Sequence, residues 1–366
     1  MLIDIIAGAR PNFMKIAPII EEIGKAKIEG ENIDYRLVHT GQHYDQKMSG
    51  NFFEELGIPE PNINLGSGSG TQAEQTAAIM VRYEKVLLDQ RPDLVLVVGD
   101  VTSTMACSIT AKKLDNIQVA HVEAGIRSGD LSMPEEINRM VTDAITDYFF
   151  TTSEVANENL TNAGVRNDRI FFVGNTMIDT LLKHRSHFKK PLIWDKLLLE
   201  DKKYIVMTLH RPANVDEEGK LKYLIQEIIN NSNNLPLVFP LHPRTAKVLE
   251  NLGISDPQLH TIDPLGYLEF NYLVDHAKAV VTDSGGITEE TTVMGIPCMT
   301  LRDNTERPET ITSGTNELLG TDPKAIKAAM EKLFSGEWKK GSIPELWDGK
   351  TAKRIVQHLL KLDQKG

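Results

Sequence analysis

The sequence predicts an α/β protein built from two doubly wound parallel sheets. Apolar runs of strand length alternate with segments of helical periodicity, which is the pattern of consecutive βα units. This alternation breaks over 183–202, and a length of 366 residues also favours two domains over one. We therefore expect a first domain over 1–182, to which a final helix at 350–366 packs back, and a second domain over 183–349.

The first half contains strands that are apolar nearly throughout. The run DLVLVV at 93–98 is typical of a parallel strand covered on both faces, and the helix expected at 12–27 has isoleucines along one face. The other expected strands are 2–7, 35–38, 117–121, 148–152 and 170–173. The other expected helices are 72–88, a segment ending at 114, 134–146, 153–163 and 175–185.

The second half repeats this architecture without a strong sequence repeat. Its expected strands are 204–209, 237–240, 258–262, 277–281 and 297–301. Its expected helices are 216–230, 243–252, 267–276, 286–294 and 323–334. Two facing α/β domains of this kind predict a ligand in the cleft between them.

Composition narrows the classes of function. No stretch reaches the roughly 18 apolar residues of a membrane span, and no signal peptide is evident. A net charge of −11 argues against general nucleic-acid binding. Cys107 and Cys298 belong to no paired motif, which fits a reducing cytoplasm. His39, His43 and Asp45 share a polar loop without a recognised ligand motif, so we expect no metal site.

The stretch HVEAGIRSGDLSMPEEINR at 121–139 concentrates charged residues where a strand ends and a helix begins, the usual place for ligands in open α/β sheets. Carboxylates at two separated positions, Glu123 and Glu135/Glu136, could divide acid and base roles there, since neighbouring carboxylates push their pKa values apart. A purely structural interpretation is also open. Ser132 and Glu135 fit a capping box, and Glu135 and Arg139 fit an i,i+4 ion pair.

Two other strand ends carry residues suited to phosphate. Ser284, Gly285 and Gly286 precede a helix whose free N–H groups and dipole attract anions, although the same residues also serve as a plain cap. Arg10 and Lys15 follow the first strand. As a cation pair they suit a diphosphate, and the alternative is that both are simply solvated.

The mouth of the second domain carries histidines. His210 could act as a general acid or orient a phosphate, and His242 stands at the matching position after the next strand. Either could instead be hydrogen-bonded within a loop. The charged run at 302–309 also follows a strand and can line the cleft.

Taken together, these motifs resemble the non-hydrolysing UDP-N-acetylglucosamine 2-epimerases. The matching segments follow the family's order over 8–310: GARPNFMKIAP, TGQHYD, GDVTST, HVEAGIRSGD, PEEINR, VGNTMID, LHRPAN, DSGGITEE and RPET. The resemblance implies two Rossmann-like domains that face each other across a cleft, the GT-B arrangement, with the active site between them. It also implies a cytoplasmic homodimer without a metal or other cofactor.

The reaction implied by the resemblance is the reversible interconversion of UDP-GlcNAc and UDP-ManNAc. Breaking the anomeric C1–O bond to UDP builds oxocarbenium character, which acidifies the hydrogen at C2. Elimination gives 2-acetamidoglucal and UDP, and protonation on the other face followed by re-addition of UDP inverts C2. Such a reaction needs carboxylates near C2 and cations or helix amides at the diphosphate.

The resemblance also assigns residues. Asp100, Glu123 and Glu135 match the catalytic carboxylates, with Asp100 favoured as the base and the two glutamates in proton delivery or charge stabilisation. Arg139 and His210 match residues that act on the sugar or diphosphate. The residues matched to substrate binding, with Glu290 at the ribose, are Arg10, Lys15, His242, Ser284, Gly285, Gly286, Glu290 and Arg307.

Alternatives remain within and outside the family. The substrate could be a UDP-diacetamido-uronic acid, or the chain could be a GT-B glycosyltransferase or a sugar-nucleotide sensor. Some family members bind a second, activating UDP-GlcNAc through a Gln-His-x-Gln run. Here the run is Gln42-His43-Tyr44-Asp45, and HRPAN replaces the HRREN-like run of many bacterial members. Both departures argue against that mode of activation.

Overall fold

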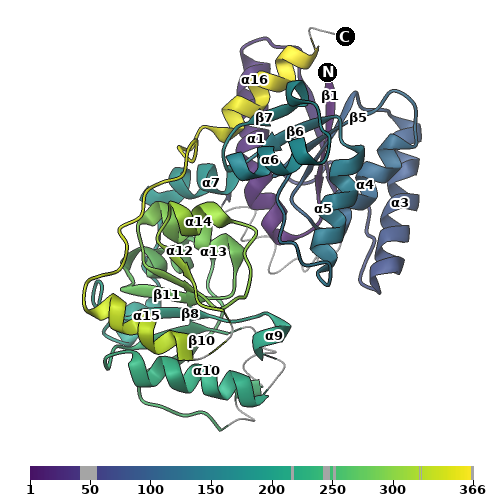
Figure 1. Ribbon diagram of the computed structural model, residues 1–366. Coiled ribbons are helices and arrows are strands. Elements are labelled where there is room, and N and C mark those ends of the chain that lie inside the picture. The colour runs from purple at the N-terminus through teal and green to yellow at the C-terminus, as the bar shows by residue number, and fades with distance from the viewer. Residues whose placement is uncertain are drawn as a thin grey trace. The chain divides into compact units, whose positions relative to one another are not determined.

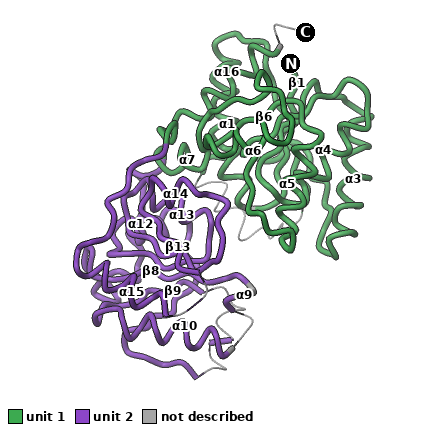
Figure 2. Tube along the Cα trace, viewed as in Figure 1, with its two compact units in different colours: residues 1–183, 345–366 green, residues 184–344 purple. Residues whose placement is uncertain are grey.

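The computed structural model describes residues 1–41, 56–215, 218–241, 248–249, 253–320, 322 and 324–363. The chain divides into two compact units, shown in Figure 2. Unit 1 comprises Met1–Lys183 and Glu345–Gly366, and unit 2 comprises His184–Pro344. Each unit contains one parallel sheet with helices packed on it, so the expected α/β class with two Rossmann-like units is confirmed.

Unit 1 holds a seven-stranded sheet in the order β3-β2-β1-β4-β5-β6-β7. Its strands are β1 Leu2–Ala7, β2 Asp34–His39, β3 Ile63–Asn64, β4 Leu94–Val98, β5 Gln118–Val122, β6 Tyr148–Thr151 and β7 Ile170–Phe172. Its helices are α1 Arg10–Ile28, α3 Gln72–Asp89, α4 Thr102–Lys112, α5 Pro134–Ile145, α6 Glu154–Asn162, α7 Thr176–His184 and α16 Thr351–Asp363. Connections run in opposite directions from β1 and β4, so a ligand-binding switch point lies at their carboxyl ends.

The helices of unit 1 form layers on the sheet, as Figure 1 shows. Helices α3, α4 and α5 pack side by side, and α1 packs against α16. Valines of the fully buried strand β4 contact Ile79, Tyr83 and Leu87 of α3. Of the run at 93–98, residues 94–98 therefore lie covered inside the sheet, whereas Asp93 is exposed.

The C-terminal segment returns to unit 1 through specific contacts. The fully buried Trp347 donates from Nε1 to the Thr152 carbonyl at 3.0 Å. The carboxylate of Asp179 in α7 accepts from the backbone N–H groups of Thr351 at 3.1 Å and Ala352 at 2.7 Å, so it caps the start of α16.

Unit 2 holds a six-stranded sheet in the order β10-β9-β8-β11-β12-β13. Its strands are β8 Ile205–Thr208, β9 Leu237–Pro240, β10 Leu259–Ile262, β11 Ala279–Thr282, β12 Cys298–Thr300 and β13 Asn316–Leu318. Its α-helices include α8 Leu192–Lys196, α9 Pro212–Val215, α10 Glu218–Asn231, α12 Tyr267–His276, α13 Gly285–Met294, α14 Pro308–Thr312 and α15 Lys324–Phe334. The switch point here lies between β8 and β11.

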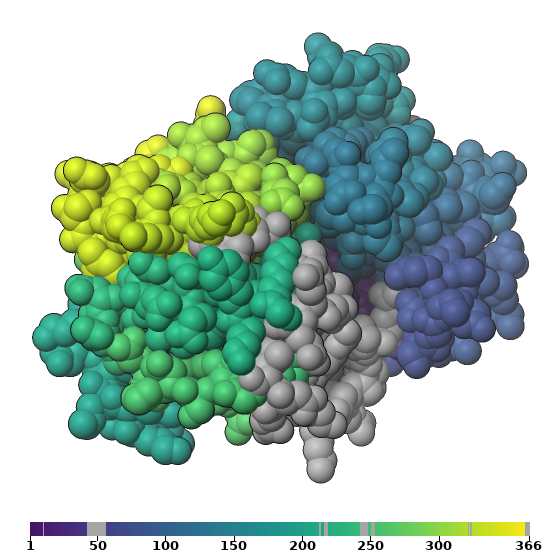
Figure 3. Space-filling model, turned by 60° about the horizontal axis from the view of Figure 1, so that its bottom comes forward, coloured from purple at the N-terminus to yellow at the C-terminus, as the bar shows by residue number. Residues whose placement is uncertain are grey.

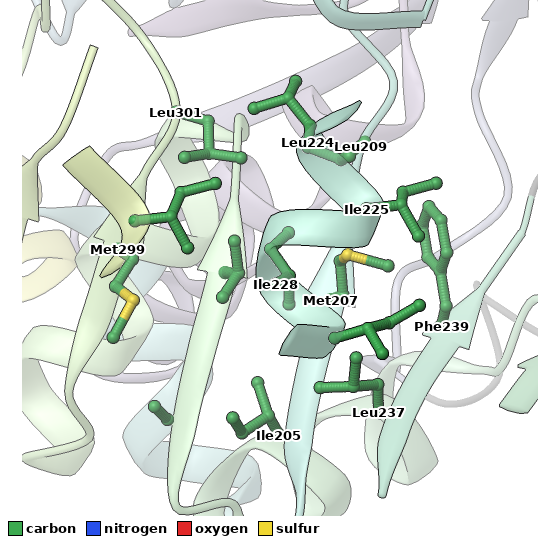
Figure 4. Packing of buried hydrophobic residues seen from close by; sticks show 14 of the residues in the cluster. Ile205, Met207, Leu209, Leu224, Ile225, Ile228, Leu237, Phe239, Met299 and Leu301 are labelled. Carbon is green, nitrogen blue, oxygen red and sulfur yellow. The ribbon is translucent and has the colours of Figure 1, made fainter. Parts of the chain in front are cut away.

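The core of unit 2 lies between this sheet and α10. Leu224 and Ile228 of α10 lie over Ile205, Met207 and other buried side chains of the strands, as Figure 4 shows. Helix α15 lies beside α10, and both reach the surface seen in Figure 3. Burying such apolar surface contributes roughly 25 cal/mol per Å² and holds the sheet that carries the site.

Two strands were not predicted from the sequence, and one predicted helix cannot be compared. The strands β3 and β13 are short edge strands of two and three residues, too short to show alternation of apolar and polar side chains. Most of the helix expected at 243–252 lies outside the described residues.

Candidate active site

Asn12 ties the start of α1 to the end of β4 at the switch point of unit 1. Its Oδ1 accepts from the backbone N–H groups of Gly8 at 3.1 Å and Ala9 at 3.0 Å. Its Nδ2 donates to the Val98 carbonyl at 3.1 Å. Asn12 was not singled out from the sequence, although an asparagine in a first helical turn is well suited to bind nearby backbone groups.

Lys15 and Glu123 form an ion pair at the same place. Lys15 Nζ donates to Glu123 Oε2 at 2.6 Å, and the two side chains are 15% and 3% exposed. Glu123 has a φ of +68°, a left-handed conformation that costs a non-glycine residue about 1–2 kcal/mol. Gly99 also has a φ of +68°, and a Cβ there would lie 3.4 Å from Lys15 Nζ. The pair therefore lies directly against the backbone that precedes Asp100.

Asp100 is oriented by a buried arginine. Its carboxylate accepts from Arg139 Nη2, and its backbone carbonyl accepts from Asn138 Nδ2 at 2.8 Å. The Asp100 side chain is 28% exposed, whereas Arg139 is 5% exposed. Asp100 is thus more accessible than Glu123, and its carboxylate is held by the buried Arg139.

The capping box and the ion pair that the sequence suggested at the start of α5 are both wrong. The N-cap residue is Met133, whose side chain makes no capping bond, so Ser132 and Glu135 form no capping box there. Arg139 pairs with Glu136, three positions away, at 2.8 Å, and Glu135 is exposed.

Glu136, and not Glu135, pairs with Arg139, because the loop at Ser128 and Gly129 folds onto the Glu136 carboxylate. Its carboxylate accepts from the backbone N–H groups of Ser128 at 2.9 Å and Gly129 at 3.1 Å. Burial would raise the pKa of Glu136, but these bonds and Arg139 outweigh burial and lower it. An ionised Glu136 therefore holds Arg139 in place beside Asp100.

In unit 2, His210 is oriented by the buried carboxylate of Asp283. His210 Nδ1 lies 2.8 Å from Asp283 Oδ1, and the imidazole is 59% exposed. Asp283 also accepts from the Arg211 N–H at 2.9 Å and from Asn214 Nδ2 at 3.1 Å. Burial would raise the pKa of Asp283, but hydrogen bonding to His210 and the other donors lowers it. The ring therefore presents Nε2 away from a fixed anion.

Asp283 was not predicted as a site residue. An aspartate directly after a buried strand is a usable signal, because parallel strands end at the ligand-binding edge of the sheet.

The N-terminus of α13 lies beside Arg302 and Glu306. Ser284 is the N-cap, and Gly285 and Gly286 open the helix. A Cβ on Gly285 would lie 3.2 Å from Glu306 Oε1 and 3.7 Å from Arg302 Nη1. Arg302 is 3% exposed and donates from Nη2 to Glu306 at 2.5 Å.

The other guanidinium donors of Arg302 point to an anion. Within the described ranges, its Nε and Nη1 are buried and have no hydrogen-bond partner. Buried donors are normally paired, so unused N–H groups of a cation beside a helix N-terminus fit a negatively charged ligand. Sequence reasoning placed Arg302 in a charged run but chose Arg307 instead.

Glu290 and Arg307 lie in the interior of unit 2. The Glu290 carboxylate accepts from Tyr267 Oη at 2.8 Å, and burial raises the pKa of Glu290 to about 7. Arg307 is buried and pairs with Glu289, which neighbours Glu290 on α13. Tyr267, at the start of α12, carried no signal in the sequence that distinguishes it from a core tyrosine.

Some expected residues cannot be placed. Of Arg10 only the backbone is described, and His242 lies outside the described residues. The same holds for the run 42–45, which includes His43 and Asp45. Among the residues that are described, no helix is both long enough and apolar enough to cross a membrane.

The described residues form one cluster in each unit. In unit 1, Asp100, Glu123, Lys15 and Arg139 gather around the turn at Gly99. In unit 2, the cluster comprises His210 on Asp283 and, directly after Asp283, the Ser284–Gly286 turn beside Arg302. The carboxylates of the first cluster are suited to an acid-base step, and the unused donors of the second are suited to a phosphate.

Comparisons with known proteins agree on one family. A family model described as UDP-N-acetylglucosamine 2-epimerase matches residues 26–360. The UDP-N-acetylglucosamine 2-epimerase of Methanocaldococcus jannaschii is 41% identical, over 98% of this chain and 99% of that protein. The UDP-2,3-diacetamido-2,3-dideoxy-D-glucuronate 2-epimerase of Pseudomonas aeruginosa is 38% identical, over 99% and 100%.

A solved structure matches the whole chain as well. The crystal structure of the Methanocaldococcus jannaschii UDP-GlcNAc 2-epimerase in complex with UDP-GlcNAc and UDP has a TM-score of 0.87 and 40% identity. The match covers 99% of this chain and 100% of that one.

Proposed function

This chain belongs to the UDP-N-acetylglucosamine 2-epimerase family, and we propose that it interconverts UDP-GlcNAc and UDP-ManNAc. It is an isomerase. The observation that supports the substrate class most directly is the presence of carboxylates at Gly99 in unit 1 and of unused Arg302 donors at the start of α13 in unit 2. A uronate-specific relative exists at similar identity, so the experiment below includes that substrate.

We assign the proton-transfer step to Asp100. Heterolysis of the C1–O bond gives an oxocarbenium-like sugar and UDP, and a base then removes the hydrogen at C2 to leave 2-acetamidoglucal. Of the two carboxylates at the Gly99 turn, Asp100 is the more accessible and is oriented by Arg139, whereas Glu123 is nearly buried and already paired with Lys15. Glu123 and Glu135 then stabilise positive charge or return a proton to the other face.

The departing diphosphate suits the start of α13 beside Arg302. The N–H groups of Gly285 and Gly286 and the free donors of Arg302 stabilise negative charge as the C1–O bond breaks. His210, fixed by Asp283, can donate to the leaving oxygen. Arg10, His242 and Arg307 remain assignments from the family resemblance. Glu290 is assigned to the ribose, whose hydroxyl groups donate to carboxylates.

We also propose a cytoplasmic homodimer. Cys107 and Cys298 are both buried free thiols, which fits a reducing compartment. Apolar side chains are exposed on α3, before α5 and on α5: Val81, Leu88, Leu131, Ile137 and Met140. Exposed apolar residues of this size often mark protein interfaces. Sedimentation of the wild type and of a Met140→Glu variant tests this. A monomeric wild type would contradict the dimer, and a variant that still dimerises would contradict this surface as its interface.

Incubation with UDP-GlcNAc in D2O tests the proposed reaction. We expect one deuterium at C2 of both epimers while UDP remains attached to the sugar. No exchange at C2 excludes the elimination route, and net release of UDP with free ManNAc indicates a hydrolysing enzyme. Running UDP-2,3-diacetamido-glucuronic acid in parallel distinguishes the uronate alternative, because that enzyme would exchange the uronate faster.

A further inference from the structure

A buried histidine lies directly behind the turn that carries Asp100. His121 of β5 is fully buried, and its Nδ1 lies 2.8 Å from Asp143 Oδ1. Its Nε2 lies 2.8 Å from the backbone carbonyl oxygen of Gly99. Carbonyl and carboxylate oxygens only accept hydrogen bonds, so each ring nitrogen must carry a proton for both contacts to be bonds. The geometry therefore requires the imidazolium form.

Asp143 supplies the negative charge that this form needs. Its second oxygen, Oδ2, accepts from the Gly125 N–H at 3.1 Å and lies 2.6 Å from Arg127 Nη1. Burial would raise the pKa of Asp143, but His121 and Arg127 outweigh burial and lower it. The buried carboxylate is thus ionised between two cations.

The network joins the segments that carry the proposed catalytic groups. Gly99 directly precedes Asp100, and His121 and Gly125 flank Glu123 on either side. Asp143 lies on α5, one helical turn after Arg139. One set of hydrogen bonds therefore connects the ends of β4 and β5 with the helix that holds Arg139.

The turn after β5 needs such support. Glu123 has a φ of +68°, and Gly125 has a φ of +77° with a Cβ position only 2.4 Å from the Ala156 carbonyl. A strained backbone persists only where the surroundings over-determine it. The bond from Gly125 to Asp143 is one such constraint, and the bond from Glu123 N–H to the Phe150 carbonyl at 3.0 Å is another.

We infer that His121, as an imidazolium ion bridged to Asp143, is a positioning residue for the epimerisation, which holds Asp100 and Glu123 at the separation the reaction needs. The inference rests on the proposed function, since it concerns those carboxylates. Burying the His121–Asp143 ion pair costs desolvation free energy that an apolar side chain of similar volume would not cost. We therefore attribute the ion pair to the positions of the backbone segments that it joins, and not to a gain in stability. Misplacement of a reacting group by about 1 Å can lower a rate about 100-fold.

Two substitutions separate the contacts of His121. His121→Gln can still reach the Gly99 carbonyl with an amide N–H but presents no second donor to Asp143. His121→Asn can reach Asp143 but not Gly99. We expect both to lower kcat for C2 exchange by about 10- to 100-fold while KM and the Kd for UDP change less than about twofold.

Asp147→Asn is the matched control. Asp147, directly before β6, accepts at 2.8 Å from the N–H of Val119 near the amino end of β5, and it pairs with Lys112. It should lower the melting temperature and leave kcat unchanged. If the His121 variants lose stability as the control does but keep the wild-type kcat, the positioning role is refuted. If the wild-type protein itself shows no C2 exchange, the proposed function fails first and the inference falls with it.

A spectroscopic measurement covers the case in which neither variant folds. In wild-type protein carrying ¹⁵N-labelled histidine, a buried ring that donates from both nitrogens should show two N–H groups that exchange slowly with solvent. His39 is also buried, but burial lowers its pKa, so a neutral ring is expected there. Absence of a doubly protonated, slowly exchanging ring would overturn the inference.

Discussion

Replacing Lys15 with methionine should destabilise unit 1 by about 3 kcal/mol. The substitution keeps the volume of the side chain but leaves the Glu123 carboxylate, 3% exposed, without the cation that lies 2.6 Å away. Breaking a buried ion pair by removing one partner costs about 3–5 kcal/mol. Lys15 is 15% exposed, so water can partly replace it, and we expect the lower end of that range.

The double variant Lys15→Met/Glu123→Gln should recover most of this loss, because it removes the uncompensated charge as well. Urea unfolding is followed by the fluorescence of Trp347 in unit 1, in a background where Trp194 and Trp338 of unit 2 are phenylalanine. We expect a coupling energy of about 2 kcal/mol between the two positions.

Lys25→Met on the same helix is the control. Lys25 pairs with Glu21 and Glu22 but is 54% exposed, and surface pairs contribute about 0–1 kcal/mol. If Lys15→Met costs no more than this control, or if the double variant equals the sum of the single ones, the Lys15–Glu123 pair does not carry buried charge and the reasoning is refuted.

Three further predictions concern catalysis and the nucleotide. Asp100→Asn should lower the rate of C2 deuterium exchange by about 10²- to 10⁴-fold, because it removes the base, with UDP affinity in calorimetry unchanged. Arg302→Gln should weaken UDP binding about tenfold or more, since charge-assisted bonds contribute about 1.5–3 kcal/mol. Burial raises the pKa of Glu290 to about 7, above the usual 4.5, so ionisation destabilises the fold as pH rises between these values. Glu290→Gln should therefore raise the melting temperature at about pH 8, leave it unchanged at about pH 4.5, and weaken UDP binding.

Each has a clear contrary result. Near-normal exchange by Asp100→Asn would move the base to another carboxylate. Unchanged UDP affinity in Arg302→Gln would show that its unused donors serve the fold instead. A Glu290→Gln variant that is less stable than wild type at both pH values would mean that the Tyr267 hydrogen bond to the carboxylate outweighs its burial.

Periodicity predicted the fold because each element of these sheets has a simple environment. Strand β4 is buried along its whole length, so its five residues are all apolar, and its carboxyl end could be placed next to Asp100 from the sequence. The same argument placed Ser284 at the start of α13. Where an element sits at a sheet edge, as β13 does, half-polar residues and three-residue length remove the signal.

Pairing between side chains could not be predicted in the same way. Arg139 had acidic residues both three and four positions before it, and helix geometry favours either. Glu136 is chosen because the Ser128–Gly129 backbone folds over it, a contact across eight positions that no local pattern encodes. Arg302 and Arg307 are likewise equivalent in the charged run of the sequence. Only the structure shows that Arg307 pairs with Glu289.

The two clusters divide charge as the proposed elimination requires. In unit 1 the carboxylates Asp100 and Glu123 are each held by a cation from another element, which suits them to the proposed step in which the sugar becomes positive. In unit 2 the start of α13 and the unused donors of Arg302 suit the diphosphate that becomes more negative in the same step. Groups preorganised in this way stabilise charge as it develops without reorienting, which is the largest single term in many enzymes. A glycosyltransferase would need the cluster of unit 2 but no base at C2 of the sugar. Exchange of the C2 hydrogen in intact UDP-sugar therefore distinguishes an epimerase from a glycosyltransferase.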